Sequence, residues 1–291
     1  MDALLLGLVV VMGTAMWLVA RWTFGRDGDV RVYGFWLSLT AATLSGLTLA
    51  GLGGDLANGP VWLAGGLMAL AYAIGFIVLI QRCLQIGPVG PTVTINNAAM
   101  LGGVVASLAW LAPRVPNLGE VLGILGILAG LAILAMAREK PGQTGLNSAW
   151  LRLVIPGGLC SVLSFVCQAY VGVRHPGLRA GLLYTTVNFG GAALLLLLLI
   201  RSPQRLFAQP RLVAGGIVVG IMNGIGLPLS LHAMQAFGPE IVLPLTVALP
   251  MVLVALLARL LFRERLGPLA WTGRALTALA LALLCYGHAS G

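Results

Sequence analysis

Amide and imidazole side chains interrupt several long apolar stretches of this sequence, and their chemistry could recognise a solute. The set comprises Asn96, Asn97, Gln168, Asn188, Asn223 and His232. An amide group offers two donors and one acceptor, and leaving these groups unpaired in hydrocarbon is costly. We therefore expect these side chains to face the interior of a helix bundle. Either they bond neighbouring helices to one another, or they line a polar cavity that binds a substrate.

Three aromatic residues are candidates for the walls of such a cavity, namely Trp17, Tyr72 and Tyr184. Tyr184 precedes Asn188 in the same predicted helix, 179–200. Each aromatic residue has two alternative roles, which are packing in the core and anchoring its helix at the membrane interface. The predicted substrate-binding residues are these three together with the amides and His232.

Carboxylates are absent from the middle of the apolar stretches. All eight acidic residues fall in loops or at the ends of predicted helices. No carboxylate is therefore placed at the membrane midplane to hold a metal cation or to carry a proton. A cavity of amides, hydroxyls and aromatic rings suits a neutral or zwitterionic organic solute. His232 is the one intramembrane group that could titrate near neutral pH, and a neutral hydrogen-bonded role is its alternative.

The remaining residue patterns exclude several other functions. An intramembrane enzyme would need a Ser/His, paired-Asp or HExxH arrangement at depth, and the sequence has none. The four cysteines have neither CxxC nor Cys/His spacing, so we expect no disulfide, no metal and no other cofactor. The net charge of +9 comes from arginines that lie between apolar runs, which does not indicate a nucleic-acid partner.

The elements that position these residues must be membrane helices. The chain is 59% hydrophobic and 9% charged, whereas a soluble domain has about 25% charged residues. No stretch alternates polar and apolar residues as barrel strands do, so helices are the only spanning option. No cleavable signal is evident, so we expect the first helix to remain in the protein. We predict an all-α integral membrane protein with ten transmembrane helices, at 3–20, 32–52, 61–85, 88–111, 118–137, 150–172, 179–200, 211–236, 239–262 and 268–287.

The basic residues predict how this bundle is oriented. Of the 17 basic residues, only Arg114, Arg174 and Arg179 fall in loops that follow even-numbered helices. Because basic loops favour the cytoplasmic side, both termini should lie on the non-cytoplasmic side of a bacterial-type inner membrane. The chain's partners would be the lipid bilayer and a small-molecule substrate, and we expect a monomer.

The sequence repeats itself once. Gly87-Pro88 corresponds to Gly238-Pro239 at an offset of 151, and each copy continues with a proline-containing helix, a short turn and another helix. Residues 1–140 and 148–291 would each form a five-helix repeat, joined by the polar linker 138–147. Since five is an odd number, the second repeat would enter the membrane inverted relative to the first.

Proline and charged residues suggest where the helices break and where the bundle could gate. The expected breaks involve Pro88, Pro91, Pro239, Pro244 and Pro250. A proline removes a backbone donor and frees a carbonyl, which then either bonds a neighbouring helix or lines a wet cavity.

Two charged residues near the cytoplasmic helix ends complete the gating and structural set. Arg82 is expected to extend its side chain toward the interface, with binding of an anionic group as the alternative. Glu264, between Arg263 and Arg265, is expected to bond neighbouring basic or helix-end groups.

Glycines within the apolar stretches predict close helix packing. Gly126 and Gly130 form a GxxxG pattern, and Gly216, Gly220 and Gly224 form two more in succession. In lipid, helices associate through close backbone approach at such small residues. We expect these glycines to pack helices within one chain, with a dimer interface as the alternative.

The pattern around the last two helices resembles the drug/metabolite transporter superfamily, specifically its ten-helix EamA-type members. The resemblance rests on Pro250, the stretch Phe262-Arg263-Glu264-Arg265-Leu266-Gly267-Pro268 and the following Trp271-Thr272-Gly273. The first half has a weaker match at 116–123, which lacks the Glu-Arg pair. The resemblance implies a secondary transporter that works by alternating access, most commonly exporting amino acids or related metabolites.

Two other kinds of cargo stay open. One alternative is a flippase or carrier for a lipid-linked or nucleotide-linked sugar, for which Arg82, Arg174 and Arg179 would have to supply basic groups at headgroup depth. The other is uptake of a sugar or a nucleoside.

Overall fold

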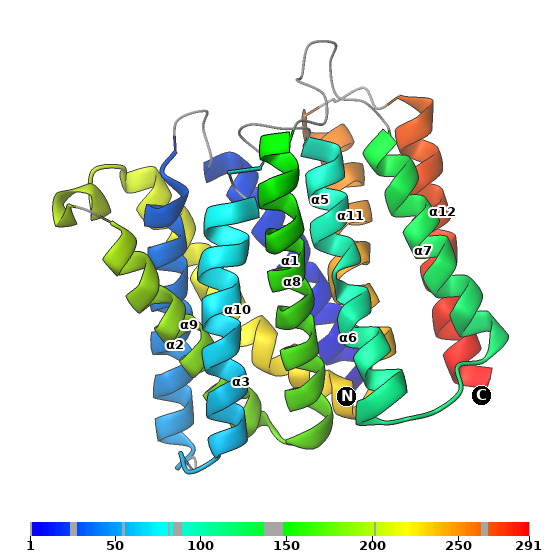
Figure 1. Ribbon diagram of the computed structural model, residues 1–291, viewed down its shortest axis with the longest axis horizontal. Coiled ribbons are helices and arrows are strands. Elements are labelled where there is room, and N and C mark those ends of the chain that lie inside the picture. The colour runs from blue at the N-terminus through cyan, green and yellow to red at the C-terminus, as the bar shows by residue number, and fades with distance from the viewer. Residues whose placement is uncertain are drawn as a thin grey trace.

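The computed structural model describes residues 2–23, 28–53, 56–80, 82–83, 89–136, 148–200, 202–262 and 267–290. Nearly all of these residues are helical and none of them lies in a strand, so the predicted all-α fold is confirmed. Figure 1 shows the helices side by side, with most of their axes aligned along one common direction and the chain running up or down it.

The helices of the first half begin with α1 (Asp2–Thr23) and α2 (Val30–Gly51). They continue with α3 (Gly59–Leu70), the π-helix η1 (Ala71–Ile80), α5 (Val89–Ala98), α6 (Met100–Ala106), the π-helix η2 (Ser107–Leu111) and α7 (Leu118–Met136). The second half contains α8 (Ser148–Arg174), α9 (Leu178–Leu199), the 3-10 helix η3 (Pro203–Leu206), α10 (Pro210–Phe237), α11 (Pro239–Phe262) and α12 (Pro268–Ser290).

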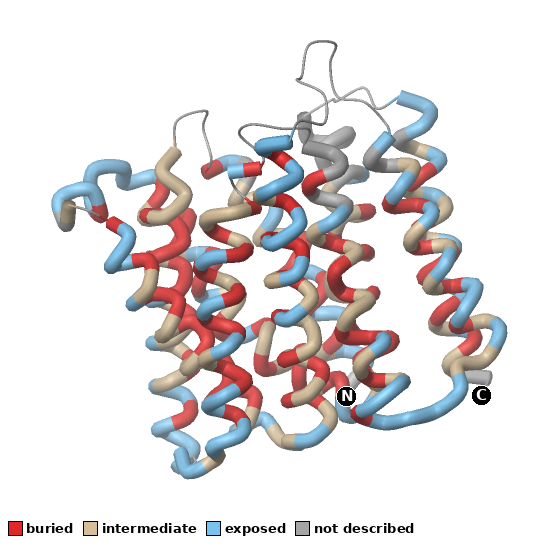
Figure 2. The backbone as a smooth tube through the Cα atoms, viewed as in Figure 1, coloured by how far each residue is buried: buried red, intermediate tan, exposed pale blue. Residues whose placement is uncertain are grey.

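Six helical stretches are long and apolar enough to cross a membrane. They are Ala3–Ala20, Val30–Gly51, Gly59–Ile80, Ser148–Arg174, Leu178–Leu199 and Pro210–Phe237, and shorter apolar helices accompany them. Large apolar side chains such as Leu4 and Leu198, each 81% exposed, lie on the outer surface. Figure 2 shows how exposed and buried positions alternate around the helices. These features fit a multi-pass membrane protein, since such a surface is compatible with lipid and not with water.

Local sequence fixes where several helices begin and end. The Asp29 carboxylate caps α2 by accepting a hydrogen bond from the backbone N–H of Arg31, and the Asn58 side chain caps α3 in the same way through Val61. Proline occupies the first turn of α10, where its missing N–H has no intrahelical partner to lose. Gly238 ends α10 with a φ of 73°, a conformation that favours glycine.

The predicted proline breaks are only partly correct. Gly238-Pro239 does separate α10 from α11, as expected. Pro244 and Pro250, in contrast, lie inside the continuous helix α11, so the prediction that they interrupt it is wrong. The fixed φ of proline is close to the helical value, so a long helix can lose single hydrogen bonds and continue. Pro91 lies within α5, and Pro88 lies outside the described residues.

Glycines bring α7 and α12 into backbone contact in an antiparallel arrangement. A Cβ atom added at Gly123 would lie 2.7 Å from the Leu284 Cβ, and one at Gly126 would lie 2.7 Å from the Ala280 Cβ. One turn further along α7, Gly130 faces Thr277. Residue numbers therefore rise along α7 as they fall along α12. Figure 1 shows this pair of helices at one edge of the bundle.

The successive GxxxG patterns of α10 pack against α2 in a parallel arrangement. A Cβ atom at Gly216 would lie 2.8 Å from the Tyr33 carbonyl oxygen, and one at Gly220 would lie 2.6 Å from the Leu37 carbonyl oxygen. Gly224 continues the same register against Ala41. The prediction that these glycines pack helices within one chain is thereby confirmed.

The first testable prediction compares two glycines on α10. In Gly220→Ala the new methyl group would meet the Leu37 carbonyl at 2.6 Å, whereas at Gly226 no atom lies within 4 Å of an added Cβ. Both variants gain the better helix propensity of alanine, about 0.5–1 kcal/mol. We expect Gly220→Ala to lower the melting temperature of the detergent-purified protein, because overpacking costs about 1–3 kcal/mol. Gly226→Ala should leave it unchanged or raise it. Equal melting temperatures for the two variants would contradict the packing described for α2 and α10.

Candidate functional site

The centre of α9 carries two fully buried polar side chains without partners. Tyr184 and Asn188 both have 0% exposure. Within the described part of the chain, neither the Tyr184 hydroxyl nor the Asn188 amide oxygen and nitrogen has a hydrogen-bond partner. Tyr184 belongs to the same buried apolar cluster as Met68, Met100 and Met234. An unpaired buried polar group costs about 1–3 kcal/mol, so these residues are retained at the expense of stability.

Three other predicted amides, Asn96, Asn97 and Asn223, have hydrogen-bond partners among the described residues, and none of these bonds joins two amides. Asn96 on α5 accepts a hydrogen bond of 2.8 Å from the Ser161 hydroxyl on α8. The Asn97 amide donates to the Met251 sulfur on α11, and Asn223 on α10 donates to the Val219 carbonyl and to the Met16 sulfur on α1. Because a thioether is a weak acceptor, Asn97 is only weakly satisfied, whereas Asn223 also has the Val219 carbonyl. These amides connect neighbouring helices in this structure.

The predicted aromatic residues separate into two groups. Tyr72 on η1 packs edge-to-face on Phe189 with ring centroids 5.5 Å apart, and it also contacts the buried cluster that contains Tyr184. Tyr72 therefore packs against α9, the helix that carries Tyr184 and Asn188, and forms one group with these two residues. Trp17 on α1 is 40% exposed and is not enclosed in this group.

The two remaining candidates for substrate binding are half-buried. His232 lies on α10, and its Nδ1 atom is buried and has no partner among the described residues. Gln168 lies on α8. Neither residue is linked by a hydrogen bond to Asn188 or Tyr184 within the described ranges.

The residues predicted to gate or to shape the bundle lie at several places. Pro239, Pro244 and Pro250 are buried on α11. A Cβ atom added at Gly13 would lie 3.2 Å from the Pro250 Cγ, so this proline packs against α1. The Arg82 side chain is exposed. The side chain of Pro91 and the whole of Pro88 and Glu264 lie outside what the structure describes.

An ion network that the sequence did not predict joins the two halves of the chain. The Arg114 guanidinium donates to both carboxylate oxygens of Glu120, at 2.8 and 2.7 Å, and to the Glu240 Oε1 atom at 2.9 Å. The Ser107 hydroxyl donates to the Glu240 Oε2 atom at 3.2 Å. His288 Nδ1 lies 3.1 Å from Glu120 Oε1. We call these five residues the Arg114 network.

The charges of the Arg114 network are shielded from solvent to very different degrees. The Glu120 and Glu240 side chains are 2% and 9% exposed, whereas the Arg114 side chain is 36% exposed. The hydrogen bond to Glu120 raises the pKa of Arg114, and Glu240 raises it further, so the guanidinium stays charged at any physiological pH. Two buried carboxylates thus depend on one guanidinium, with His288 as the only other basic group in the network.

A local sequence signal for part of this network did exist. Asn117 and Glu120 form a capping box at the start of α7, in which each side chain accepts a hydrogen bond from the other's backbone N–H, at 2.9 and 3.0 Å. The N-x-x-E pattern predicts this pair. Nothing in the local sequence indicates that Glu240, far along the chain, reaches the same guanidinium.

A cleft adjoins the Arg114 network. It has a volume of about 340 Å³ and is lined by Ser107, Gln235, Glu240 and the chain around Gly172 and Gly238. The carboxylate of Glu240 therefore lies between the guanidinium of Arg114 and an open space at the end of the bundle.

Comparison with known proteins identifies the fold and nothing more specific. No protein-family model matches the chain, and no curated protein matches it. The chain is similar to a solved crystal structure with a TM-score of 0.74, over 97% of this chain and 95% of the other. The two sequences are 17% identical, so the likeness shows a shared fold alone.

The second prediction concerns the Arg114 network. In Arg114→Leu, two buried carboxylates lose their guanidinium, and breaking a buried ion pair costs about 3–5 kcal/mol. We expect a clearly lower melting temperature of the purified protein. The control is Arg174→Leu, which removes the same charge from the same end of the bundle but breaks only one long hydrogen bond, of 3.4 Å, to the Trp110 carbonyl. If both variants melt at the same temperature, the network does not stabilise the fold.

Proposed function

We propose that this protein is a secondary transporter with ten membrane helices, similar to EamA-type members of the drug/metabolite transporter superfamily. It moves a small neutral or zwitterionic organic metabolite by alternating access. An amino-acid-like solute and export are the favoured cargo and direction. The observation that carries the proposal is that several of the closest helix pairs have a counterpart when the two halves are exchanged.

This exchange can be followed helix by helix. The exchange replaces each helix of one half by its counterpart in the other half. The counterparts are α1 and α8, α2 and α9, α3 and α10, α6 and α11, and α7 and α12. The pair of α2 with α10, held at Gly220, becomes the pair of α9 with α3, which exists and is held at Gly65 against Val187. In the same way, the pair of α1 with α11 becomes that of α8 with α6, which is also in contact.

The direction of the helices supports an inverted repeat. The exchange of the halves maps the pair of α2 and α9 onto itself, and it does the same for the pair of α7 and α12. Both pairs are antiparallel, since Gly34 lies against Leu196 and Gly46 lies against Thr186, as in the register described for α7 and α12. A twofold axis that relates antiparallel helices runs perpendicular to them, hence in the membrane plane. This is the symmetry of many transporters whose substrate site lies between the repeats.

The chemistry of the buried residues supports a neutral or zwitterionic cargo. Asn188 and Tyr184 offer an amide and a hydroxyl that have no hydrogen-bond partner among the described residues, and Tyr72 packs on Phe189 of the same helix. A solute that forms hydrogen bonds with these groups would offset the free-energy penalty of burying them. A solute without matching polar groups would leave them unpaired. No carboxylate lies beside them within the described residues.

The Arg114 network supports a closed state at one end of the bundle. Arg114, Glu120 and Ser107 belong to the first half, whereas Glu240 and His288 belong to the second. In Figure 1 the marked N- and C-terminal ends lie at the same end of the bundle as the α6–α7 connection that contains Arg114. If the termini are non-cytoplasmic, as the basic residues predict, opening of that side must separate Arg114 from Glu240.

The third prediction tests transport and the site together. Purified protein in proteoliposomes should move at least one member of a panel of amino acids, nucleosides, sugars and amines, with and without a pH gradient. We expect Asn188→Leu to melt at the same temperature as the wild type or higher, because the unpaired amide is removed at similar volume. The same variant should lose most of the transport. A variant that keeps transport would contradict the assignment of Asn188, and a panel with no transported member would contradict the transporter proposal.

The fourth prediction concerns localisation and topology. The protein should fractionate with the bacterial-type inner membrane, and a tag at either terminus should be accessible from the non-cytoplasmic side only. A tag in the linker 138–147 should be accessible from the cytoplasmic side only, because an odd number of helices separates it from each terminus. A terminus and the linker on the same side would contradict the inverted repeat.

A further inference from the structure

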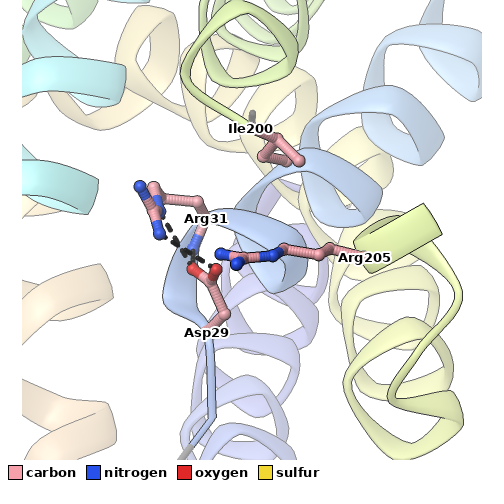
Figure 3. A pocket seen from close by; sticks show the side chains of 4 residues that line it. All are labelled: Asp29, Arg31, Ile200 and Arg205. Carbon is pink, nitrogen blue, oxygen red and sulfur yellow. Dashed lines mark hydrogen bonds and ion pairs between the residues drawn. The ribbon is translucent and has the colours of Figure 1, made fainter. Parts of the chain in front are cut away.

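A basic pocket lies at the peripheral edge of the bundle, between the start of α2 and the η3 segment. It has a volume of about 170 Å³ and is lined by Asp29, Arg31, Ile200 and Arg205. Figure 3 shows the Asp29 carboxylate between the guanidinium groups of Arg31 and Arg205. A second hollow of about 240 Å³ shares Asp29 and Arg205 and extends to Gln209. We call this region the Arg205 pocket.

The Arg205 pocket carries one more positive charge than negative charge. Arg31 forms an ion pair with Asp29, in which its Nε and Nη2 atoms donate to the two carboxylate oxygens, each at 3.1 Å. The Arg205 side chain is exposed and makes no hydrogen bond or salt bridge within the described residues. Burial acts to raise the pKa of Asp29, but the hydrogen bonds from Arg31 and the charge of Arg205 outweigh it, so the pKa is lowered and the carboxylate stays ionised. The guanidinium of Arg205 is therefore available to an anion.

Aromatic residues around the Arg205 pocket place it at the depth of a membrane interface. The Trp36 indole donates to the Leu206 carbonyl at 2.9 Å and packs edge-to-face on Phe207, whose side chain is 66% exposed. At the same end of the bundle, Arg211 lies 4.6 Å from the centre of the Trp22 ring, which is 59% exposed. Exposed aromatic rings beside arginines are typical of the headgroup region of a bilayer.

The position of the Arg205 pocket argues for a ligand that arrives from the membrane. The pocket is formed by the η3 segment, which in Figure 1 projects from the edge of the bundle opposite to α7 and α12. Residues of both halves line the pocket, but it lies at the outer edge of the bundle and not in its interior, so a transported solute would not pass through it. Lipid molecules, in contrast, surround this edge at all times.

We propose that the Arg205 pocket binds the phosphate group of an anionic phospholipid in the cytoplasmic leaflet. A guanidinium offers parallel N–H donors that match two phosphate oxygens, and Arg205 has such donors free. Phe207 would lie against the apolar part of the same lipid. This binding does not depend on what the protein transports. Inorganic phosphate shares the chemistry of the headgroup, so the experiment must separate these two sources.

The fifth prediction is measured by native mass spectrometry of the full chain released from detergent. The probes are dioleoyl phosphatidylglycerol, dioleoyl phosphatidylcholine and, in a separate arm, inorganic phosphate. We expect the wild type to retain the anionic lipid better than the zwitterionic one. Arg205→Gln should reduce this retention about fivefold, which corresponds to one basic residue near a lipid headgroup. Inorganic phosphate alone should bind weakly and should not displace the lipid.

Two variants serve as controls for charge. Arg179→Gln removes the same charge from the first turn of α9, at the opposite end of that helix from η3, and should retain the lipid as the wild type does. Asp29→Asn keeps a good N-cap for α2 while it removes the one negative charge in the pocket, so it should increase retention of the anionic lipid. A purely structural role of Arg205 would not produce this increase.

The possible results separate the hypotheses clearly. Equal retention of the two lipids by the wild type, or equal retention of the anionic lipid by wild type and Arg205→Gln, would overturn the proposal. Displacement of the lipid by inorganic phosphate would identify a free-phosphate site instead, which also overturns it. None of these results bears on transport, whose test uses Asn188 and a different assay.

Discussion

Close approach between helix backbones is the constraint on which the rest of this structure depends. In a bilayer the lipid tails are as apolar as leucine, so helices gain little by burying apolar surface against one another. They associate where side chains are small enough for backbones to touch. The antiparallel pair of α7 and α12 and the parallel pair of α2 and α10 both meet this requirement through glycines, at Gly123 and Gly220 for example. Because both pairs join the two halves of the chain, glycine packing also determines how the halves face each other.

Such tight packing makes the few buried polar groups conspicuous. Several buried hydroxyls are satisfied locally, as when Thr185 donates to the carbonyl of Gly181 one turn earlier in its own helix. Asn188 makes no such bond, and neither its amide nor the Tyr184 hydroxyl has a partner among the described residues. The contrast within one helix separates Thr185, whose hydroxyl is satisfied locally, from Tyr184 and Asn188, whose polar groups are not. A buried polar group that no neighbouring residue satisfies indicates a role beyond folding.

The sequence predicted much of the helix arrangement because long apolar runs and glycine spacing are local signals. All predicted helical ranges overlap helices of the structure, and the packing role of Gly216, Gly220 and Gly224 was read from their spacing alone. The sequence was misleading at Pro244 and Pro250, since whether a proline breaks a helix depends on its neighbours in space. It also did not predict the Arg114 network. Charges near helix ends resemble ordinary interfacial residues until tertiary structure brings Glu120 and Glu240 to one guanidinium.

The geometry of the Arg114 network bears on how a rocking motion could be reversible. Arg114 holds Glu120 with two hydrogen bonds inside the first half, and it reaches Glu240 in the second half with one. If the halves separate at this end, Arg114 therefore keeps a compensated charge. Glu240 would lose Arg114 and Ser107 together, but it already borders the 340 Å³ cleft, where water can replace them. Closure at this end thus depends on the two hydrogen bonds of Glu240 and on the contact of His288 with Glu120, while the pair of Arg114 and Glu120 stays intact. A motion between two states of similar free energy requires such an arrangement, because a fully buried ion pair across the interface would hold one state permanently.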